Sequence, residues 1–176
     1  MEHIVTASFI DDRIITEDSD PARDLYSKSR FGSPRAKGRI LLSHLEALYL
    51  VDAGKLTVLD SRNKPIEFER LMKRLRRKDK DIWVRYQVFA DLRRRGYIVK
   101  TALKFGAEFR VYDKGVKPGE DHAKWVVYPV PESQKLTWYE FSAKNRVAHS
   151  TKKRLLIGVV DDEGDVTYYE IKWMRP

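Results

Sequence analysis

Three side chains of this sequence could move protons or stabilise charge at a reacting centre, and their local sequences suit three different roles. Tyr112 ends F-R-V-Y, His122 ends P-G-E-D-H, and Lys153 lies within S-T-K-K-R-L-L-I. RNA carries its own nucleophile, the ribose 2′-hydroxyl, so its cleavage needs a base, an acid and a cation near the phosphate. A tyrosine, a histidine and a lysine can together supply these functions. The three residues therefore suggest RNA cleavage without a metal ion.

Each of the three residues also has an ordinary structural interpretation when it is considered alone. Tyr112 shares the face of Arg110 on an expected strand, opposite Phe109 and Val111, and a tyrosine in a sheet is usually structural. A histidine at a junction between loop and strand is more often a surface residue than a catalyst. A lysine in a basic turn is usually solvated. The three residues become a candidate site only as a set.

Composition indicates a folded protein with a real core. The chain has 176 residues, of which 42% are hydrophobic and 11% aromatic, so it is long enough for one ordinary domain or two small ones. It contains no run of about 18 apolar residues, as a membrane span requires. The first residues lack the charged and apolar regions of a signal peptide. We therefore expect a soluble, cytoplasmic protein with no membrane partner.

Residue usage also bears on cofactors. The absence of cysteine excludes disulfides, thiolate catalysis and cysteine-based metal sites. The four histidines are scattered, with no i, i+4 pair and no H-x-x-E cluster. His44 follows Ser43 in a capping box and is interpreted as a residue of a helix first turn. We expect neither a metal site nor a cofactor.

The chain carries a formal net charge of +9, which favours a polyanionic partner. Charge runs are most often solvated helix faces, but a phosphate-facing role fits this density equally well. One run is Arg93–Arg95. The denser run contains Arg70, Lys73, Arg74, Arg76, Arg77, Lys78 and Lys80.

The pattern of apolar residues, caps and breakers predicts a small N-terminal α/β domain over residues 1–80. It contains a hairpin over 3–9 and 13–16, then a helix capped by Ser19 with proline in its first turn. A capping box leads the second helix, and Gly54 ends it. The basic run then lies on the exposed side of an amphipathic third helix. The other expected strands cover 39–42 and 55–60.

The charged tetrapeptide K-D-K-D at 78–81 is the expected domain boundary, and a second α/β domain follows over 81–176. A helix that ends at Gly96 precedes strands at 97–104, 108–112 and 124–130. Another helix over 137–149 and strands at 154–160 and 165–173 complete the pattern. Helix, three strands, helix and two strands predict a compact α/β domain with a mixed sheet.

Four motifs of the C-terminal half occur together in one known family. They are F-G-A-E-F-R-V-Y, P-G-x-x-H, R-V-A-H-S-T-K-K and D-x-x-G-D-V-T-Y-Y. In this order and spacing they resemble the archaeal tRNA-splicing endonucleases, in the short form that assembles as a homotetramer. The resemblance is looser over residues 1 to about 80. It implies a catalytic C-terminal domain similar to restriction-endonuclease folds.

The resemblance also implies a substrate and a mechanism. The substrate is precursor tRNA with a bulge-helix-bulge motif, and the products are a 2′,3′-cyclic phosphate and a 5′-hydroxyl. Tyr112 is the implied base, His122 the acid and Lys153 the electrostatic stabiliser. A lysine near a tyrosine favours the phenolate form, which is a reason to find both in one site.

The family resemblance implies roles for further residues. Arg146 corresponds to an arginine that stacks on a flipped-out base, which suits a guanidinium plane. Trp173, in the expected last strand, lies near a second stacking position, and a core role is its alternative. The acidic turn Asp161, Asp162, Glu163 and Asp165 docks on a neighbouring subunit in the family; a solvated hairpin tip is its alternative.

Two other functions remain open at this point. Glu170 and Lys172 form an E-x-K fragment of the kind used by metal-dependent DNA nucleases, although such a site needs a further acidic ligand for Mg²⁺. Alternatively, the chain is a noncatalytic, structural RNA-binding subunit. The presence of tyrosine, histidine and lysine together argues against this second alternative.

Overall fold

A computed structural model describes residues 4–176, and the expected start of the first strand at residue 3 lies outside this range. The chain divides into two compact units, Met1–Tyr86 and Gln87–Pro176. The domain boundary expected after residue 80 thus lies before the observed division. The first unit extends further because Tyr86 still packs within it. Its hydroxyl donates to Asp52 at 2.8 Å, and its ring lies 5.4 Å from that of Phe68.

The N-terminal unit contains a mixed five-stranded sheet in the order β3-β4-β2-β1-β5, in which β1 and β5 are parallel. The predicted hairpin is confirmed, because β1 and β2 pair in antiparallel fashion across the turn at 11–12. The strand β3 was not expected from the sequence. The strands are β1 (Val5–Ile10), β2 (Arg13–Thr16), β3 (Ser33–Pro34), β4 (Ile40–Leu42) and β5 (Leu56–Leu59).

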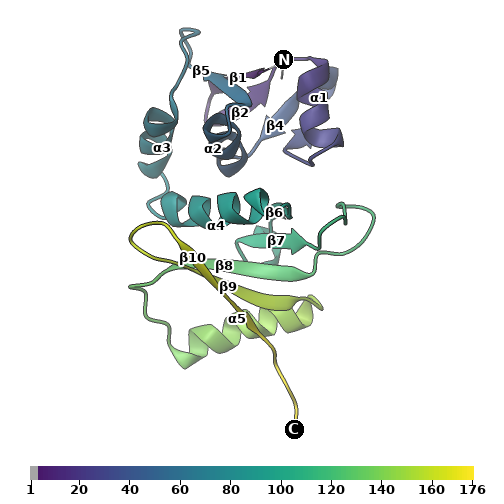
Figure 1. Ribbon diagram of the computed structural model, residues 1–176, viewed down its shortest axis with the longest axis vertical. Coiled ribbons are helices and arrows are strands. Elements are labelled where there is room, and N and C mark those ends of the chain that lie inside the picture. The colour runs from purple at the N-terminus through teal and green to yellow at the C-terminus, as the bar shows by residue number, and fades with distance from the viewer. Residues whose placement is uncertain (1–3) are drawn as a thin grey trace. The chain divides into compact units, whose positions relative to one another are not determined.

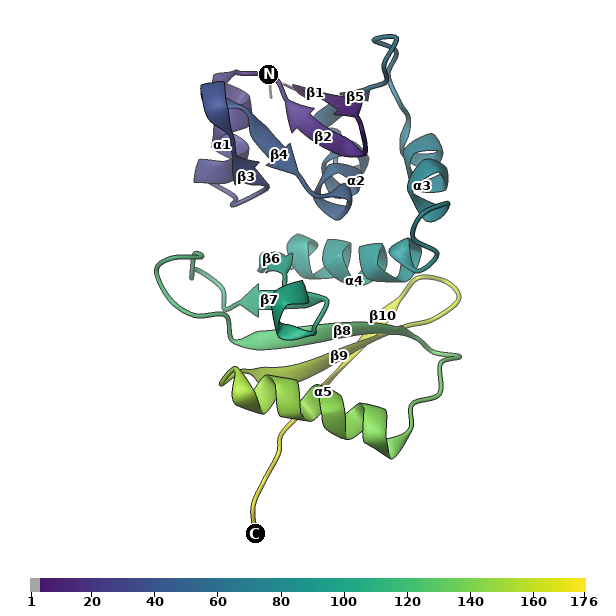
Figure 2. The ribbon, with the colours of Figure 1, turned by 180° about the vertical axis from the view of Figure 1, so that it is seen from behind.

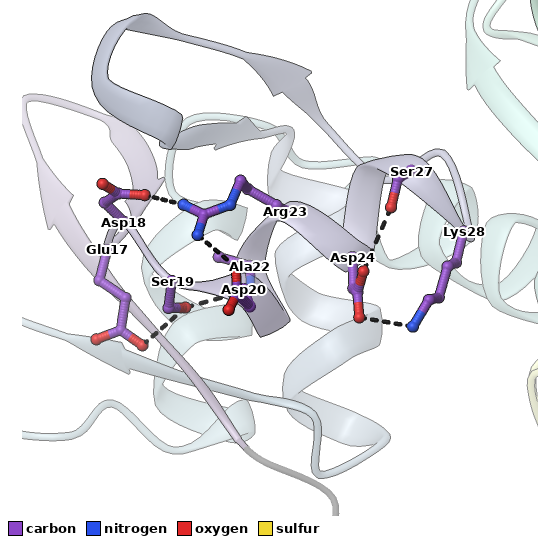
Figure 3. Close-up of polar contacts among 9 residues, drawn as sticks. All are labelled: Glu17, Asp18, Ser19, Asp20, Ala22, Arg23, Asp24, Ser27 and Lys28. Carbon is purple, nitrogen blue, oxygen red and sulfur yellow. Dashed lines mark hydrogen bonds and ion pairs between the residues drawn. The ribbon is translucent and has the colours of Figure 1, made fainter.

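The helices of this unit begin where their capping residues predict. Ser19 accepts from the backbone of Ala22 at 3.2 Å and caps α1 (Asp20–Ser27), whose surface carries ion pairs of Arg23 and Lys28 (Figure 3). The predicted capping box opens α2 (His44–Asp52), so His44 is a first-turn residue as expected. Gly54 follows α2 in the left-handed conformation, which favours glycine. The amphipathic third helix is α3 (Phe68–Arg76), with Leu71, Met72 and Leu75 buried.

The C-terminal unit is built on a second mixed sheet, in the order β10-β9-β8-β7-β6, in which only β8 and β9 are parallel (Figures 1 and 2). The α/β class expected from the sequence is therefore confirmed. The expected strand at 97–104 is shorter, since a 3₁₀ turn occupies Leu103–Phe105. The elements are α4 (Ile82–Arg94), β6 (Ile98–Thr101), β7 (Phe109–Tyr112), β8 (Trp125–Pro131), α5 (Trp138–Ser150), β9 (Arg154–Val160) and β10 (Val166–Ile171).

Helices cover both faces of the C-terminal sheet. α5 packs on one face, where Ala148 joins a buried cluster with Leu155 and Ile157 of β9. On the other face, the part of α4 after Tyr86 supplies Phe89, whose ring lies 6.0 Å from that of Phe109. Burial on both faces fixes which side chains of each strand point inward. None of the helices in the described part of the chain is long and apolar enough to cross a membrane.

Candidate active site

Tyr112, His122 and Lys153 come together because three neighbouring strands start or stop at the same end of the C-terminal sheet. Val111 of β7 lies opposite Trp125 of β8, and Trp125 lies opposite Arg154 of β9. Tyr112 directly follows Val111, and Lys153 directly precedes Arg154. The loop that carries His122 leads into β8, which is the strand between β7 and β9. Residues far apart in the sequence thus reach one edge of the sheet.

The three side chains line one pocket of about 390 Å³ in the C-terminal unit. Tyr112 forms part of the buried wall and is 4% exposed, whereas His122 is exposed. A tyrosine held by the sheet and a histidine on a loop can approach a bound substrate from different elements. The other lining residues are Arg110, Gly119, Glu120, Asp121 and Ala123.

The turn after α5 fixes the position of Lys153. Lys152 adopts a left-handed backbone conformation with a φ of 55°, and this reverses the chain at the helix end. The backbone N–H of Lys153 then donates to the carbonyl of Ala148 at 2.8 Å. Its ammonium donates to the carbonyl of Thr151 at 3.0 Å. The half-buried lysine is therefore held at the pocket rather than extended into solvent.

The loop that carries His122 is anchored at its base by an ion pair. Lys124 Nζ lies 2.6 Å from Asp113 Oδ2, which joins the end of β7 to the start of β8. The hydrogen bond from Lys124 lowers the pKa of the Asp113 carboxyl below its ordinary value, with a smaller contribution from the backbone N–H of Lys114. Within the loop, the backbone N–H of His122 donates to Asp121 Oδ1 at 2.6 Å.

The structure does not place Arg146 or Trp173 among the residues that line this pocket. Arg146 is exposed on α5, with its guanidinium 5.9 Å from the ring centroid of Tyr139. The prediction that Trp173 lies in the last strand is wrong, because β10 ends at Ile171. Trp173 is 53% exposed and contacts the ring of His149, at 4.8 Å between centroids. A core role for Trp173 is thereby overturned.

The acidic turn forms the tip of the β9–β10 hairpin. Asp161 Oδ1 accepts from the backbone N–H groups of Glu163 and Asp165, at 3.0 and 2.9 Å, so this carboxylate shapes the turn. Asp162, Glu163 and Asp165 are exposed. Within residues 4–176, none of the four acids has an ion-pair partner in the same chain.

The E-x-K fragment belongs to a cluster of side chains on the sheet. Glu170 accepts from Trp125 Nε1 at 2.8 Å and from Arg154 Nη1 at 3.1 Å, while Lys172 lies 3.8 Å from the same carboxylate. The hydrogen bond from Trp125 contributes most to lowering the pKa of Glu170. In the described part of the chain, no three His, Cys, Asp or Glu side chains gather as metal ligands. Glu170 thus has protein partners for both of its oxygens.

Three charged residues of the pocket were not singled out from the sequence: Arg110, Glu120 and Asp121. The alternation along β7 puts Arg110 on the face of Tyr112, and this signal was sufficient to find it. The two acids flank His122 in an irregular loop, where no periodicity indicates the direction of a side chain.

Comparison with known proteins supplies the context of this pocket. The model for the catalytic C-terminal domain of tRNA intron endonucleases matches residues 82–168, and the model for their N-terminal domain matches residues 5–72. The chain belongs to the tRNA intron endonuclease family. The resemblance noted from the four motifs is therefore confirmed, and all residues lining the pocket fall within the match to the catalytic domain.

Relatives within the tRNA intron endonuclease family match most of the chain. A tRNA-splicing endonuclease of Thermococcus kodakarensis is 41% identical over 164 residues, which cover 93% of this chain and 95% of that protein. One from Pyrococcus furiosus is 39% identical over 175 residues, or 99% of each chain. One from Methanothermobacter thermautotrophicus is 41% identical over 157 residues, or 88% and 89%. The similarity therefore extends over both units.

Proposed function

We propose that this chain is a tRNA-splicing endonuclease that excises introns from precursor tRNA. It cuts RNA at bulge-helix-bulge junctions without a metal ion. The observation that carries the proposal is the single pocket lined by Tyr112, His122 and Lys153 within a domain that matches the family's catalytic domain. These three side chains supply a base, an acid and a cation, which is the set that transesterification at a ribose requires.

In the proposed reaction, Tyr112 as phenolate takes the proton of the ribose 2′-hydroxyl, and the 2′-oxygen attacks the adjacent phosphorus. The bond from phosphorus to the 5′-oxygen breaks, and His122 gives its proton to that oxygen. Lys153 stabilises the negative charge of the pentacovalent phosphorane. The products are a 2′,3′-cyclic phosphate and a 5′-hydroxyl. Tyr112 and His122 return to their starting forms by proton exchange with solvent.

Cleavage of a bulged RNA in excess EDTA tests this proposal directly. We expect the intron to be released at the same rate with EDTA as with Mg²⁺, because the RNA and the three side chains supply every group that the reaction uses. End analysis should give cyclic phosphate and 5′-hydroxyl termini. A control RNA with 2′-deoxyribose at the cleaved position should stay intact. Loss of activity in EDTA would favour a metal-dependent nuclease, and intact RNA under all conditions would favour a noncatalytic subunit.

Substrate recognition beyond the pocket is proposed for the C-terminal end of α5. Arg146 and His149 lie three positions apart on this helix, which places them on neighbouring parts of its surface. The exposed ring of Trp173 rests against His149, and the side chain of Arg146 is exposed. A guanidinium plane and an indole ring are both suited to stacking on an unpaired base of the bulge.

We also propose that the chain works as a homotetramer and that the acidic turn docks on a neighbouring copy. The turn's exposed carboxylates would repel RNA phosphates, and they have no cationic partner within the described part of their own chain. In a basic protein, such acids are suited to cations on another subunit. Interface charges of this kind chiefly set register and partner choice. The arrangement would hold active sites at a fixed separation, so that both ends of an intron can be cut.

Replacing Asp161, Asp162 and Asp165 with Asn and Glu163 with Gln should yield a folded species smaller than wild type, most simply a dimer. Asn at position 161 keeps an oxygen that can accept the turn's backbone N–H groups, so the hairpin should survive. Cleavage should be poor although Tyr112, His122 and Lys153 are unchanged. Sedimentation at several salt concentrations measures the size of the assembly.

A matched control removes four other exposed acids and thus makes the same change in net charge. If the variant of the acidic turn stays tetrameric and active, the turn is a solvated hairpin tip and not a docking device. The control carries Asp11→Asn, Glu67→Gln, Glu69→Gln and Glu132→Gln, and it should remain tetrameric.

A further inference from the structure

We propose that Arg110 holds the non-bridging oxygens of the scissile phosphate in the pocket of Tyr112, His122 and Lys153. This inference rests on the proposed function, because it assigns a positioning role within the same reaction. Arg110 belongs to β7 and lies in register with Lys100 on one side and Val126 on the other. Its neighbours Phe109 and Val111 are buried, and Arg110 lines the pocket together with Tyr112.

The guanidinium of Arg110 has a donor without a protein partner. Its Nε is buried, and within the described residues it makes no hydrogen bond. A buried donor in a native structure is normally satisfied, and an arginine cannot relieve the cost by losing its proton. A guanidinium that lines an open pocket, and that forms no ion pair with the acids of the described chain, points to an anionic ligand. The Nε atom itself is covered, so the oxygens of a phosphodiester would bind the other nitrogens of the guanidinium.

Two other arginines of the described chain have a buried Nε without a hydrogen bond, and both have an alternative interaction. Arg85 forms an ion pair with Asp79 through another of its nitrogens. Arg30 lies over the ring of Tyr26, at 5.3 Å from the centroid. Neither of them lines the pocket of the candidate active site. Arg110 is thus distinguished by where its unsatisfied donor is located.

The acids of the same pocket are engaged elsewhere. Asp121 Oδ1 accepts from the backbone of His122 at 2.6 Å, and Glu120 Oε2 accepts from the backbone of Lys117 at 3.4 Å. Neither carboxylate has a hydrogen bond or an ion pair with Arg110 in the described structure. The positive charge of Arg110 therefore remains available to substrate.

Arg110 and Lys153 would then have different roles at the phosphate. The planar guanidinium binds two oxygens at once and so fixes orientation, whereas the ammonium of Lys153 acts as a point charge. Arg110 sets the phosphate in line with the attacking 2′-oxygen, and Lys153 neutralises the charge that develops there. Arg110 accordingly binds the phosphate in the ground state as well as in the transition state.

The decisive experiment compares wild type and Arg110→Gln on bulged RNA with a single phosphorothioate of defined stereochemistry at the cleaved position. On unmodified RNA, Arg110→Gln should lower the single-turnover rate roughly 10- to 100-fold, as expected when a charged, bidentate hydrogen bond is removed. In wild type, sulfur in either isomer should slow cleavage, because Arg110 holds both non-bridging oxygens and sulfur accepts hydrogen bonds poorly. In the variant, this sulfur effect should disappear, since two changes to the same interaction do not add.

A merely structural role for Arg110 would leave the sulfur effect intact. An Arg110→Gln variant that keeps it in full, or that cleaves at the wild-type rate, overturns the proposal. Arg110→Lys retains the charge without the fork and should give an intermediate rate. Where Gln impairs folding, Arg110→Met replaces it and preserves the apolar stem. Lys135→Gln removes an exposed charge between β8 and α5, and this control should cleave normally.

A second measurement separates failure of this inference from failure of the proposed function. If wild type does not cleave bulged RNA, the proposed function fails, and titration with inorganic phosphate then decides the role of Arg110. Amide resonances of β7 and residues 119–123 should shift in wild type and stay unchanged in Arg110→Gln. Absence of a shift in wild type, or an equal shift in both proteins, overturns the assignment of a phosphate to Arg110.

Discussion

His122→Ala should lower the single-turnover rate of cleavage by about 10²- to 10⁴-fold, which is the usual contribution of a positioned acid or base. The side chain is exposed on a loop, so its removal leaves no cavity in the core. Folding should be unaffected, and binding of an RNA blocked by 2′-deoxyribose should remain nearly unchanged. The effect arises because the departing 5′-oxygen would leave without a proton donor.

Quench-flow kinetics with enzyme in excess, together with circular dichroism, would measure both expectations. His44→Ala is a suitable control, because His44 lies in the first turn of α2 and does not line the pocket. It should cleave at nearly the rate of wild type. Near-normal cleavage by His122→Ala would remove His122 from the mechanism, and an equal loss in both variants would indicate a general defect.

Lys153→Ala should depress the same rate by about 10²- to 10³-fold, as found when one group that stabilises a transition-state charge is removed. The loss should appear at saturating enzyme, because the ammonium counts most when the phosphorane carries its extra negative charge. Affinity for the blocked RNA should fall much less. Lys152→Asn is the matched control, since it removes the same charge one residue away. Asn also tolerates the left-handed backbone at this position.

Variants of α3 should weaken RNA binding and leave the rate unchanged, which is the opposite of the effect expected for Lys153→Ala. Arg70, Lys73 and Arg76 are exposed and line a groove on this helix, where they could face phosphates of the RNA. Replacing them with Gln should weaken binding and reduce its salt dependence by roughly one unit of slope for each phosphate that is no longer neutralised, with the rate at saturation preserved. A Lys153→Ala variant that changed only affinity would contradict the role assigned to Lys153.

The sequence by itself determined the features that depend on residues a few positions apart. Ser19, the capping box that begins at Ser43, and Gly54 each act within about one helical turn, so their positions were sufficient to place helix ends. Alternation along 109–112 likewise assigned Tyr112 to one face of its strand. The family motifs also indicated which residues belong to one site. The same local reasoning placed Trp173 in a strand, and there it failed.

Only the tertiary structure decided which strands are neighbours and what their ends bring together. The pairing of Val111 with Trp125, and of Trp125 with Arg154, joins three segments through hydrogen bonds across long sequence separations. Such pairings depend on packing against α4 and α5, which no local pattern encodes. The end of β10 before Trp173 depends in the same way on where its partner β9 begins. The pocket, and the unsatisfied guanidinium of Arg110 within it, exist only once these non-local pairings have formed.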